Sequence, residues 1–178
     1  PLGAEPGVTV TIVQPGDPIP GDADIVLLPG SKAVRADLAV LRAEGWDIDI
    51  RAHVRRGGIV VGLCGGYQML GNSVADPEGI EGPTGTSEGL GMLDVDTVLA
   101  GNKTLSEAEA IEAGTGATVR GYEMHMGVTT GPGLARPMLD FGGRMDGAVS
   151  PDGRVMGCYL HGLFAADEFR AAFLSRIR

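Results

Sequence analysis

The sequence predicts an α/β fold built around a parallel sheet, and three observations in the first third of the chain support this. Short apolar runs at 24–28 and 59–63 are typical of buried parallel strands, and each is followed by a glycine-containing turn. The segment between them has helical periodicity, with Val34, Leu38 and Leu41 on one stripe. Strand, helix and strand therefore alternate, as they do in α/β proteins.

The other elements follow from local composition in chain order. Residues 7–13 are β-branched through their interior and predict a strand. Helices are expected at 33–44 and 46–56, because both stretches end at glycine and the first carries the apolar stripe. Residues 72–91 are rich in Gly, Pro, Ser, Asp and Glu and predict a long surface loop. Also expected are strands at 91–99, 117–126 and 154–160, an exposed acidic stretch at 104–114 and an amphipathic helix at 166–178.

Composition and charge narrow the class of protein. The 178 residues suffice for one domain, predicted over 1–178, and no apolar run approaches the ~18 residues that span a bilayer. The chain has 14 basic and 23 acidic residues, a net charge of −9, and its basic residues are scattered. Nucleic acid and membrane are therefore not expected as partners. Two cysteines are too few for a disulfide framework, so we expect a reducing, cytoplasmic location.

Residues 62–66, GLCGG, match the nucleophile elbow G-x-nucleophile-x-G, with Cys64 at the nucleophile position. The motif needs its glycines because the nucleophile occupies a strained strand-to-helix turn, where nearby side chains would collide. The N-terminus of the following helix would face Cys64, and its partial positive charge favours a thiolate. The alternative interpretation is a buried cysteine in a glycine-rich turn, since this chain contains 30 glycines.

A thiol nucleophile needs a base, and the sequence offers three histidines. His53 falls in a predicted surface helix and is expected to be solvated. His161 ends a predicted strand, and α/β sheets place their active sites at the carboxyl ends of parallel strands. His125 competes with it, and the pattern leaves both open. The sequence contains no C-x-x-C or H-x-x-x-H spacing, so no metal site is predicted. It also contains no G-x-x-x-x-G-K-[ST] loop, so ATP binding is not predicted. Cys158 is expected in the core.

Four ordered motifs carry a family resemblance: LPGSK at 28–32, GLCGGYQMLG at 62–71, GYEMHMG at 121–127 and YLHGLF at 159–164. Together they resemble the glutamine amidotransferase domains of the cobyric acid synthase family. That family lies in the cobalamin-pathway branch of the class I (triad-type) amidotransferases. The nearest alternatives are the domains of cobyrinic acid a,c-diamide synthase and of lipid II-amidating relatives. A peptidase-like cysteine hydrolase and a non-catalytic interaction domain are alternatives of other classes.

The resemblance implies a flavodoxin-like three-layer sandwich with a mainly parallel central sheet, which hydrolyses glutamine to glutamate and ammonia. It implies that the ammonia amidates a corrinoid acceptor, adenosylcobyrinic acid a,c-diamide, in an N-terminal P-loop synthetase domain of the same full-length chain. ATP and Mg²⁺ are expected in that domain, and no cofactor is expected in this chain. The family's domain usually begins one strand earlier than Pro1, so a first strand and the synthetase domain are expected before it.

Carried onto this sequence, the family motifs make Cys64 the nucleophile and His161 the base. The thiolate would attack the amide carbon of glutamine, and the imidazolium would protonate the departing ammonia. The expected oxyanion hole consists of backbone N–H groups of the elbow and of the turn after the strand at 24–28. The residues assigned to it are Gly30, Ser31 and Gly65.

One position departs from the common class I pattern. Many class I amidotransferases carry Glu two residues after the histidine, where it orients the imidazole, but this chain has Leu163. The cobalamin branch also lacks that acid, so the family resemblance stands while His161 is left without an evident orienting group. Glu123 is the candidate, either for that role or for binding the substrate. Gln68 and His125 are further candidates for binding or supporting roles.

Overall fold

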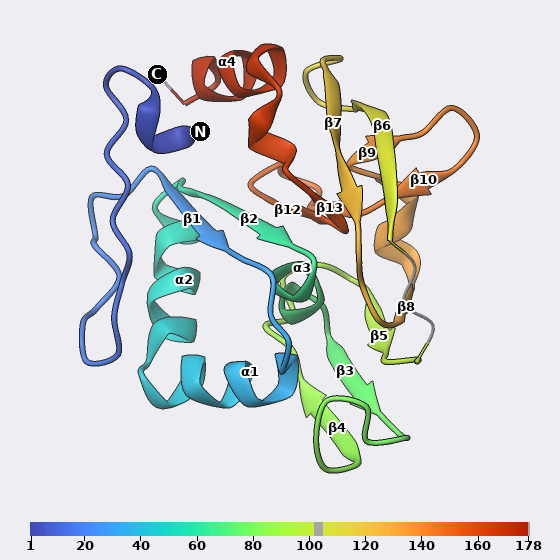
Figure 1. The fold of residues 1–178 in the computed structure, drawn as a ribbon. Helices are drawn as coiled ribbons and strands as arrows, with labels where there is room; N and C mark the ends of the chain where they lie inside the picture. The colour runs from blue at the N-terminus through green and yellow to red at the C-terminus, as the bar shows by residue number, and fades with distance from the viewer. Residues whose placement is uncertain (102–104, 178) are drawn as a thin grey trace.

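The structure is a computed structural model of the 178-residue chain, and it describes residues 1–101 and 105–177. Its central sheet has the strand order β1-β2-β12-β11 (Figure 1). The strands β1 (Ile25–Leu28), β2 (Ile59–Leu63) and β12 (Val155–Cys158) are parallel, and β11 (Ala148–Val149) is antiparallel to β12. The carboxyl ends of the three parallel strands therefore meet at one edge of the sheet. The predicted α/β class is confirmed.

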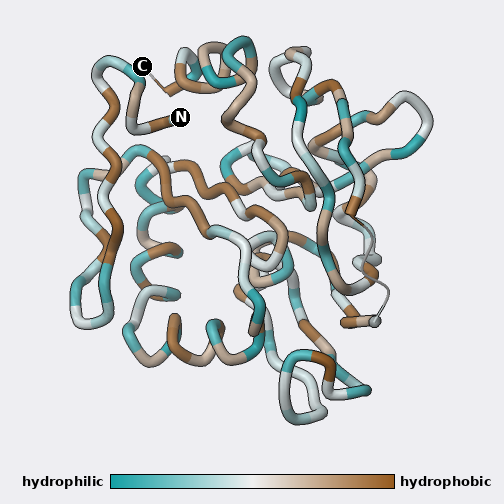
Figure 2. Tube along the Cα trace, viewed as in Figure 1, coloured by the Kyte–Doolittle hydropathy of each residue, from teal (hydrophilic) through white to brown (hydrophobic). Residues whose placement is uncertain are grey.

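Each face of this sheet is covered by its own hydrophobic core. On one face pack α1 (Val34–Ala43), α2 (Trp46–Arg55) and α3 (Gly65–Leu70). On the other face lie α4 (Asp167–Ser175) and a second sheet. The hydrophobic residues of β1 and β2 run through the middle of the molecule between these layers (Figure 2). The arrangement is a three-layer α/β sandwich, as the family resemblance implies.

Two mainly antiparallel sheets complete the fold. The order in the second sheet is β10-β9-β6-β7-β13, and in the third it is β4-β3-β5-β8. The strands of the second sheet are β6 (Ser106–Glu112), β7 (Thr118–Glu123), β9 (Leu139–Asp140), β10 (Met145–Asp146) and β13 (Leu160–His161). The strands of the third are β3 (Ser73–Asp76), β4 (Gly85–Glu88), β5 (Asp96–Val98) and β8 (Val128–Thr130). Short 3₁₀ turns lie at Leu2–Ala4, Pro132–Ala135 and Leu163–Ala165.

Three local predictions were wrong. No strand forms at 7–13, where Val10 and Ile12 are 57% and 78% exposed, because β propensity without a neighbouring strand does not make a sheet. The expected loop at 72–91 contains β3 and β4. The acidic stretch at 104–114 forms β6, although residue 104 lies outside the described residues. Two other predictions are confirmed with shorter bounds: the strand at 91–99 is observed as β5, and the helix at 166–178 is observed as α4, with residue 178 undescribed.

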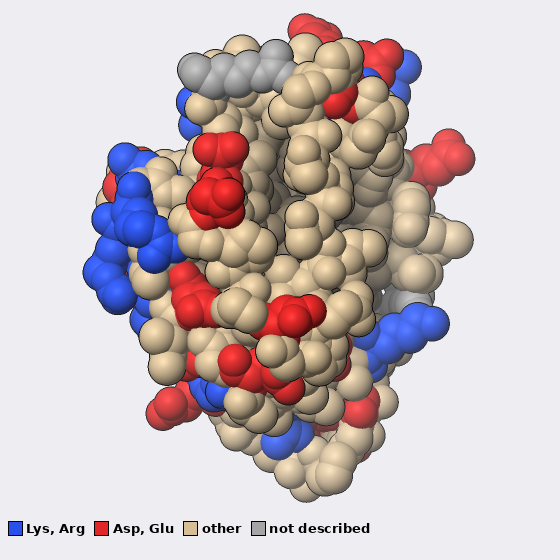
Figure 3. All heavy atoms as spheres, turned by 90° about the vertical axis from the view of Figure 1, so that its left-hand side faces the viewer, with Lys and Arg blue, Asp and Glu red and all other residues tan. Residues whose placement is uncertain are grey.

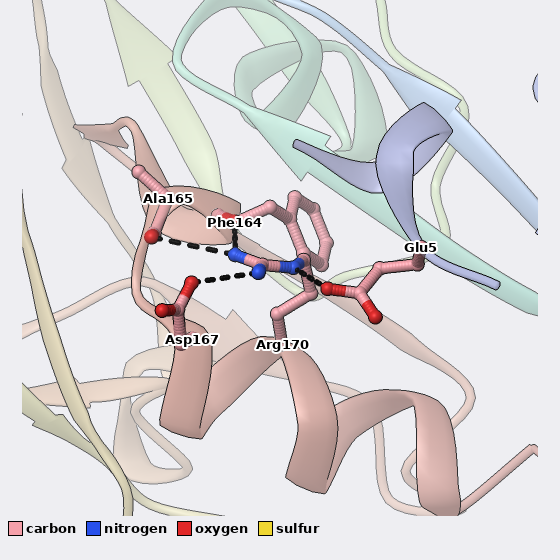
Figure 4. Close-up of polar contacts among 5 residues, drawn as sticks. All are labelled: Glu5, Phe164, Ala165, Asp167 and Arg170. Atoms are coloured by element: carbon pink, nitrogen blue, oxygen red, sulfur yellow. Dashed lines mark hydrogen bonds and ion pairs between the residues drawn. The ribbon is translucent and has the colours of Figure 1, made fainter.

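Arg170 of α4 links the N-terminal segment to the C-terminal helix (Figure 4). Its guanidinium donates to the Glu5 carboxylate at 2.5 Å, to the Asp167 carboxylate at 2.6 Å and to the carbonyl of Phe164 at 2.9 Å. The Arg170 side chain is only 13% exposed, and its partner Glu5 is 28% exposed, whereas Asp167 is 91% exposed and lies at the surface. The N-terminal segment is thus docked by side chains rather than by strand pairing.

The surface carries both signs of charge. On the face that bears the N-terminal segment and α2, the largest group of basic side chains lies at the left, smaller basic groups lie at the right edge and near the bottom, and acidic side chains are spread between them (Figure 3). Among residues 1–101 and 105–177, no helix is long and apolar enough to cross a membrane.

Candidate active site

Cys64 lies at the turn between β2 and α3 with φ 53° and ψ −111°. It is the one non-glycine residue with positive φ in the described part of the chain. Such a conformation costs about 1–3 kcal/mol and persists only where the surrounding structure imposes it. The turn thus has the strained conformation that the GLCGG motif predicts for an elbow.

The elbow glycines are required because backbone groups approach them too closely for a side chain. A Cβ atom on Gly62 would lie 2.6 Å from the carbonyl oxygen of Gly66. A Cβ atom on Gly66 would lie 2.1 Å from the carbonyl oxygen of Leu28 at the end of β1. The start of α3 therefore packs directly on the carboxyl ends of β1 and β2, and this contact holds Cys64 at the sheet edge.

His161 lies beside Cys64 in the folded chain. Its Nε2 is 3.3 Å from the carbonyl oxygen of Met124, and the Cys64 thiol donates to the same oxygen at 3.6 Å. Gly30 contacts both groups, since a Cβ atom there would lie 3.2 Å from Cε1 of His161 and 3.7 Å from Cβ of Cys64. The ends of β1, β2, β7 and β13 therefore bring the predicted nucleophile and base to one place.

The predicted oxyanion donors also come together. Gly65 is the first residue of α3, so its N–H has no partner within the helix. A Cβ atom on Gly65 would lie 2.7 Å from the backbone nitrogen of Ser31, which puts the two backbones in direct contact. The hydroxyl of Ser31 donates to the Asp37 carboxylate and accepts from the N–H of Ala33, so the turn is held at the start of α1. The role of these donors stays a prediction.

Tyr122 is a neighbour of His161 that the sequence did not indicate. The two residues sit opposite each other in the β7–β13 pair. Their rings are stacked, with centroids 4.9 Å apart and planes 5° from parallel. No sequence signal could have found this contact, because it depends on the register between strands about forty residues apart.

Glu123 does not face His161, so the geometry argues against the orienting role considered for it. Successive residues of a strand point to opposite faces of the sheet. Tyr122 is on the same face as His161, so Glu123 is on the opposite face. Glu123 instead forms a bidentate ion pair with Arg144, with N···O distances of 2.6 and 3.1 Å. A substrate-binding role for Glu123 stays a prediction.

Gln68 and His125 both contact Tyr159. The Gln68 side chain is buried, and its Nε2 donates to the carbonyl of Met126 at 2.9 Å and to the hydroxyl of Tyr159 at 3.1 Å. The His125 ring stacks on Tyr159, with centroids 3.7 Å apart and planes 17° from parallel. Burial is the main cause that lowers the pKa of His125 below its usual range. Gln68 thus supports the 124–126 segment, and the geometry favours His161 over His125 as base.

His53 is not solvated, contrary to the prediction, because α2 turns it toward the sheet. It is 1% exposed, its Nε2 lies 3.0 Å from the carbonyl of Ile59, and its ring fills the space beside Gly58. The prediction for Cys158 is confirmed: it is buried in β12, and burial raises the pKa of its thiol. Both side chains support the fold.

An open pocket of about 850 Å³ adjoins the site along β6 and β7. Leu105, Tyr122 and Met124 line it, so it borders both the stacked ring and the carbonyl that contacts Cys64 and His161. Neither Cys64 nor His161 is among the residues that line it. In the described part of the chain, no group of three or more His, Cys, Asp or Glu residues is arranged to hold a metal ion.

Known proteins resemble this chain in sequence and in fold. The model of the CobB/CobQ-like glutamine amidotransferase domain matches residues 1–169. The chain belongs to this family. Its amidotransferase relatives include proteins named cobyric acid synthase from Jannaschia sp., 60% identical over 176 residues, and from Rhodobacter capsulatus, 63% identical over 174 residues. These alignments cover 99% and 98% of this chain but only 37% and 36% of the relatives, so the chain spans little more than a third of their length.

Solved structures agree with the fold of this amidotransferase domain. A glutamine amidotransferase crystal structure aligns with a TM-score of 0.60 and 17% identity, covering 86% of this chain and 78% of its own. The structure of PurLQS from Thermotoga maritima aligns with a TM-score of 0.63 and 18% identity, covering 88% and 81%. At such identities these matches support the fold alone.

Proposed function

We propose that this chain is the glutamine-hydrolysing domain of a cobyric acid synthase. The observation that carries the proposal is the meeting of Cys64 and His161 at the Met124 carbonyl, in a family of glutamine amidotransferase domains. The strained elbow and the adjacent N–H donors of Ser31 and Gly65 provide the other parts that acyl transfer requires.

In the proposed reaction, His161 accepts the thiol proton of Cys64. The sulfur attacks the side-chain amide carbon of glutamine, and a tetrahedral intermediate forms with its negative oxygen at the N–H groups of Ser31 and Gly65. The C–N bond then breaks, and the proton held by His161 passes to the leaving nitrogen as ammonia departs. Water, deprotonated by His161, cleaves the glutamyl thioester to release glutamate and restore the thiol.

The ammonia would be used outside this chain. The relatives are much longer than this chain, and their additional residues are enough to form the P-loop synthetase domain. In that domain ATP and Mg²⁺ would activate carboxylates of the corrinoid acceptor. The acceptor would be adenosylcobyrinic acid a,c-diamide and the product adenosylcobyric acid. A reducing, cytoplasmic location fits a chain with two cysteines, both buried.

The test is glutamine hydrolysis by the longer protein that carries this chain, supplied with ATP and the corrinoid acceptor. We expect glutamate and the amidated corrinoid to form together, and acid quenching during turnover to trap a glutamyl adduct on Cys64, detected by mass spectrometry. Glutamate release with cobyrinic acid as the preferred acceptor would instead support the a,c-diamide synthase. Absence of both glutamate and adduct would overturn the amidotransferase proposal.

A further inference from the structure

We propose that Tyr122 is a positioning residue that fixes the orientation of the His161 imidazole through their stacked rings. This inference rests on the proposed function, in which His161 is the base. Tyr122 would take the place of the glutamate that orients the histidine in many class I amidotransferases. In this chain position 163 is leucine, and Glu123 faces the other side of β7.

The Tyr122 ring packs against the His161 imidazole and so restricts the orientation of its plane. Tyr122 and His161 are register partners of antiparallel strands, so their Cβ atoms emerge on the same face about 5 Å apart. The rings lie with centroids 4.9 Å apart and planes only 5° from parallel, so the phenol covers one face of the imidazole. Stacking uses a ring face and leaves the two nitrogens, which lie on the ring edge, for proton transfer.

Other groups restrict movement of the His161 ring within its own plane. Nε2 is held 3.3 Å from the carbonyl oxygen of Met124, and Cε1 faces Gly30, where even a Cβ atom would come within 3.2 Å. A rotation of the imidazole out of its plane is therefore opposed chiefly by the Tyr122 ring. Since a misplacement of about 1 Å can cost ~10²-fold in rate, loss of this ring should affect turnover more than substrate affinity.

The hydroxyl of Tyr122 has no part in this role, which gives a matched pair of variants. Tyr122→Phe keeps the stacked ring, and Tyr122→Leu removes it. Tyr122 is 42% exposed, so neither change leaves a large internal cavity. Arg120→Leu is the control, because Arg120 lies two residues earlier on the same face of β7, in an exposed ion pair with Glu109.

The experiment measures kcat and KM for glutamate release by the full-length protein, together with the rate constant for alkylation of Cys64 by iodoacetamide. For Tyr122→Leu we expect kcat to fall about 10- to 100-fold with KM changed less than about threefold, and alkylation to slow. Tyr122→Phe and Arg120→Leu should stay within about threefold of the parent.

The decisive comparison repeats Tyr122→Leu in a His161→Ala background. A residue that acts through His161 has no further effect there on the alkylation rate, whereas a merely structural residue costs the same in both backgrounds. Equal effects in the two backgrounds, or a Tyr122→Phe variant as impaired as Tyr122→Leu, would overturn the inference. Alkylation is measured without glutamine, so it still tests Tyr122 if the protein proves not to hydrolyse glutamine.

Discussion

The carbonyl oxygen of Met124 lies 3.3 Å from Nε2 of His161. The thiol of Cys64 donates to the same oxygen, so one peptide group contacts both the nucleophile and the base. Two residues further along, the carbonyl of Met126 accepts a hydrogen bond of 2.9 Å from the buried amide of Gln68. The reacting groups are therefore linked to α3 both through the elbow and through this segment.

Gln68→Met tests that link with a side chain of similar size. It removes the bonds to Met126 and Tyr159 and leaves the partly buried Met126 carbonyl without this donor, while the Tyr159 hydroxyl keeps its bond with Thr129, so we expect the free energy of unfolding to fall by about 1 kcal/mol. Glutaminase activity should fall as well, because the 124–126 segment loses its anchor. Urea denaturation and glutamate release measure the two effects, with exposed Gln14→Met as control. Unchanged stability and activity would contradict the proposed link.

Cys64→Ala separates the two halves of the proposed enzyme. Glutamine-dependent synthesis should disappear in the full-length protein, while synthesis from added ammonium salts continues, because the thiol serves only ammonia release. Cys158→Ala, which alters the other buried thiol, should keep both activities. Amidated corrinoid is quantified by chromatography. Loss of both activities in a folded Cys64→Ala protein would mean that Cys64 serves the synthetase step.

His161→Ala should lower the rate of glutamine hydrolysis by about 10²–10⁴-fold, the usual contribution of a general base. His125→Ala should have a smaller effect, because the His125 ring stacks on Tyr159, whereas His161 contacts the same carbonyl oxygen as Cys64. Steady-state glutamate release from each variant measures the difference. A larger loss in His125→Ala would reverse the assignment of the base.

Glu123→Gln tests what the bidentate ion pair does. The Arg144 side chain is 54% exposed, so we expect a stability loss of only about 1 kcal/mol, matched by Arg144→Met because both variants break the same pair. Since Glu123 faces away from His161, kcat should stay within about threefold of the parent, and any loss of substrate contact should appear as a higher KM. A fall in kcat at constant KM would restore the orienting role.

The 178-residue chain on its own should be a poor glutaminase, because hydrolysis without an activated acceptor would waste glutamine. The oxyanion donors come from two separate pieces, the elbow and the turn at Gly30 and Ser31. Displacement of one donor costs about 10²–10³ in rate, and glycine permits the peptide rotation that would displace it. Glutamate release is compared for the chain alone and with a separately expressed synthetase domain, ATP and corrinoid. Equal rates, near that of the full-length protein, would contradict this coupling.

The sequence by itself determined the elements that depend on interactions between neighbouring residues. The apolar runs of β1 and β2 and the stripe of α1 were predicted from a few neighbouring residues. The elbow at Cys64 was predicted for the same reason, since adjacent glycines permit a conformation that other residues resist.

Only the tertiary structure decided which distant segments meet. The acidic residues of β6 gave no strand signal, yet β6 forms because β7 and β9 pair with it, while the β-branched stretch at 7–13 has no such neighbour and forms no strand. His53 is buried because α2 packs its face on the sheet, and Tyr122 reaches His161 because β7 and β13 pair in one register. Strand pairing and packing depend on contacts between residues far apart in the chain, so local propensity does not determine them.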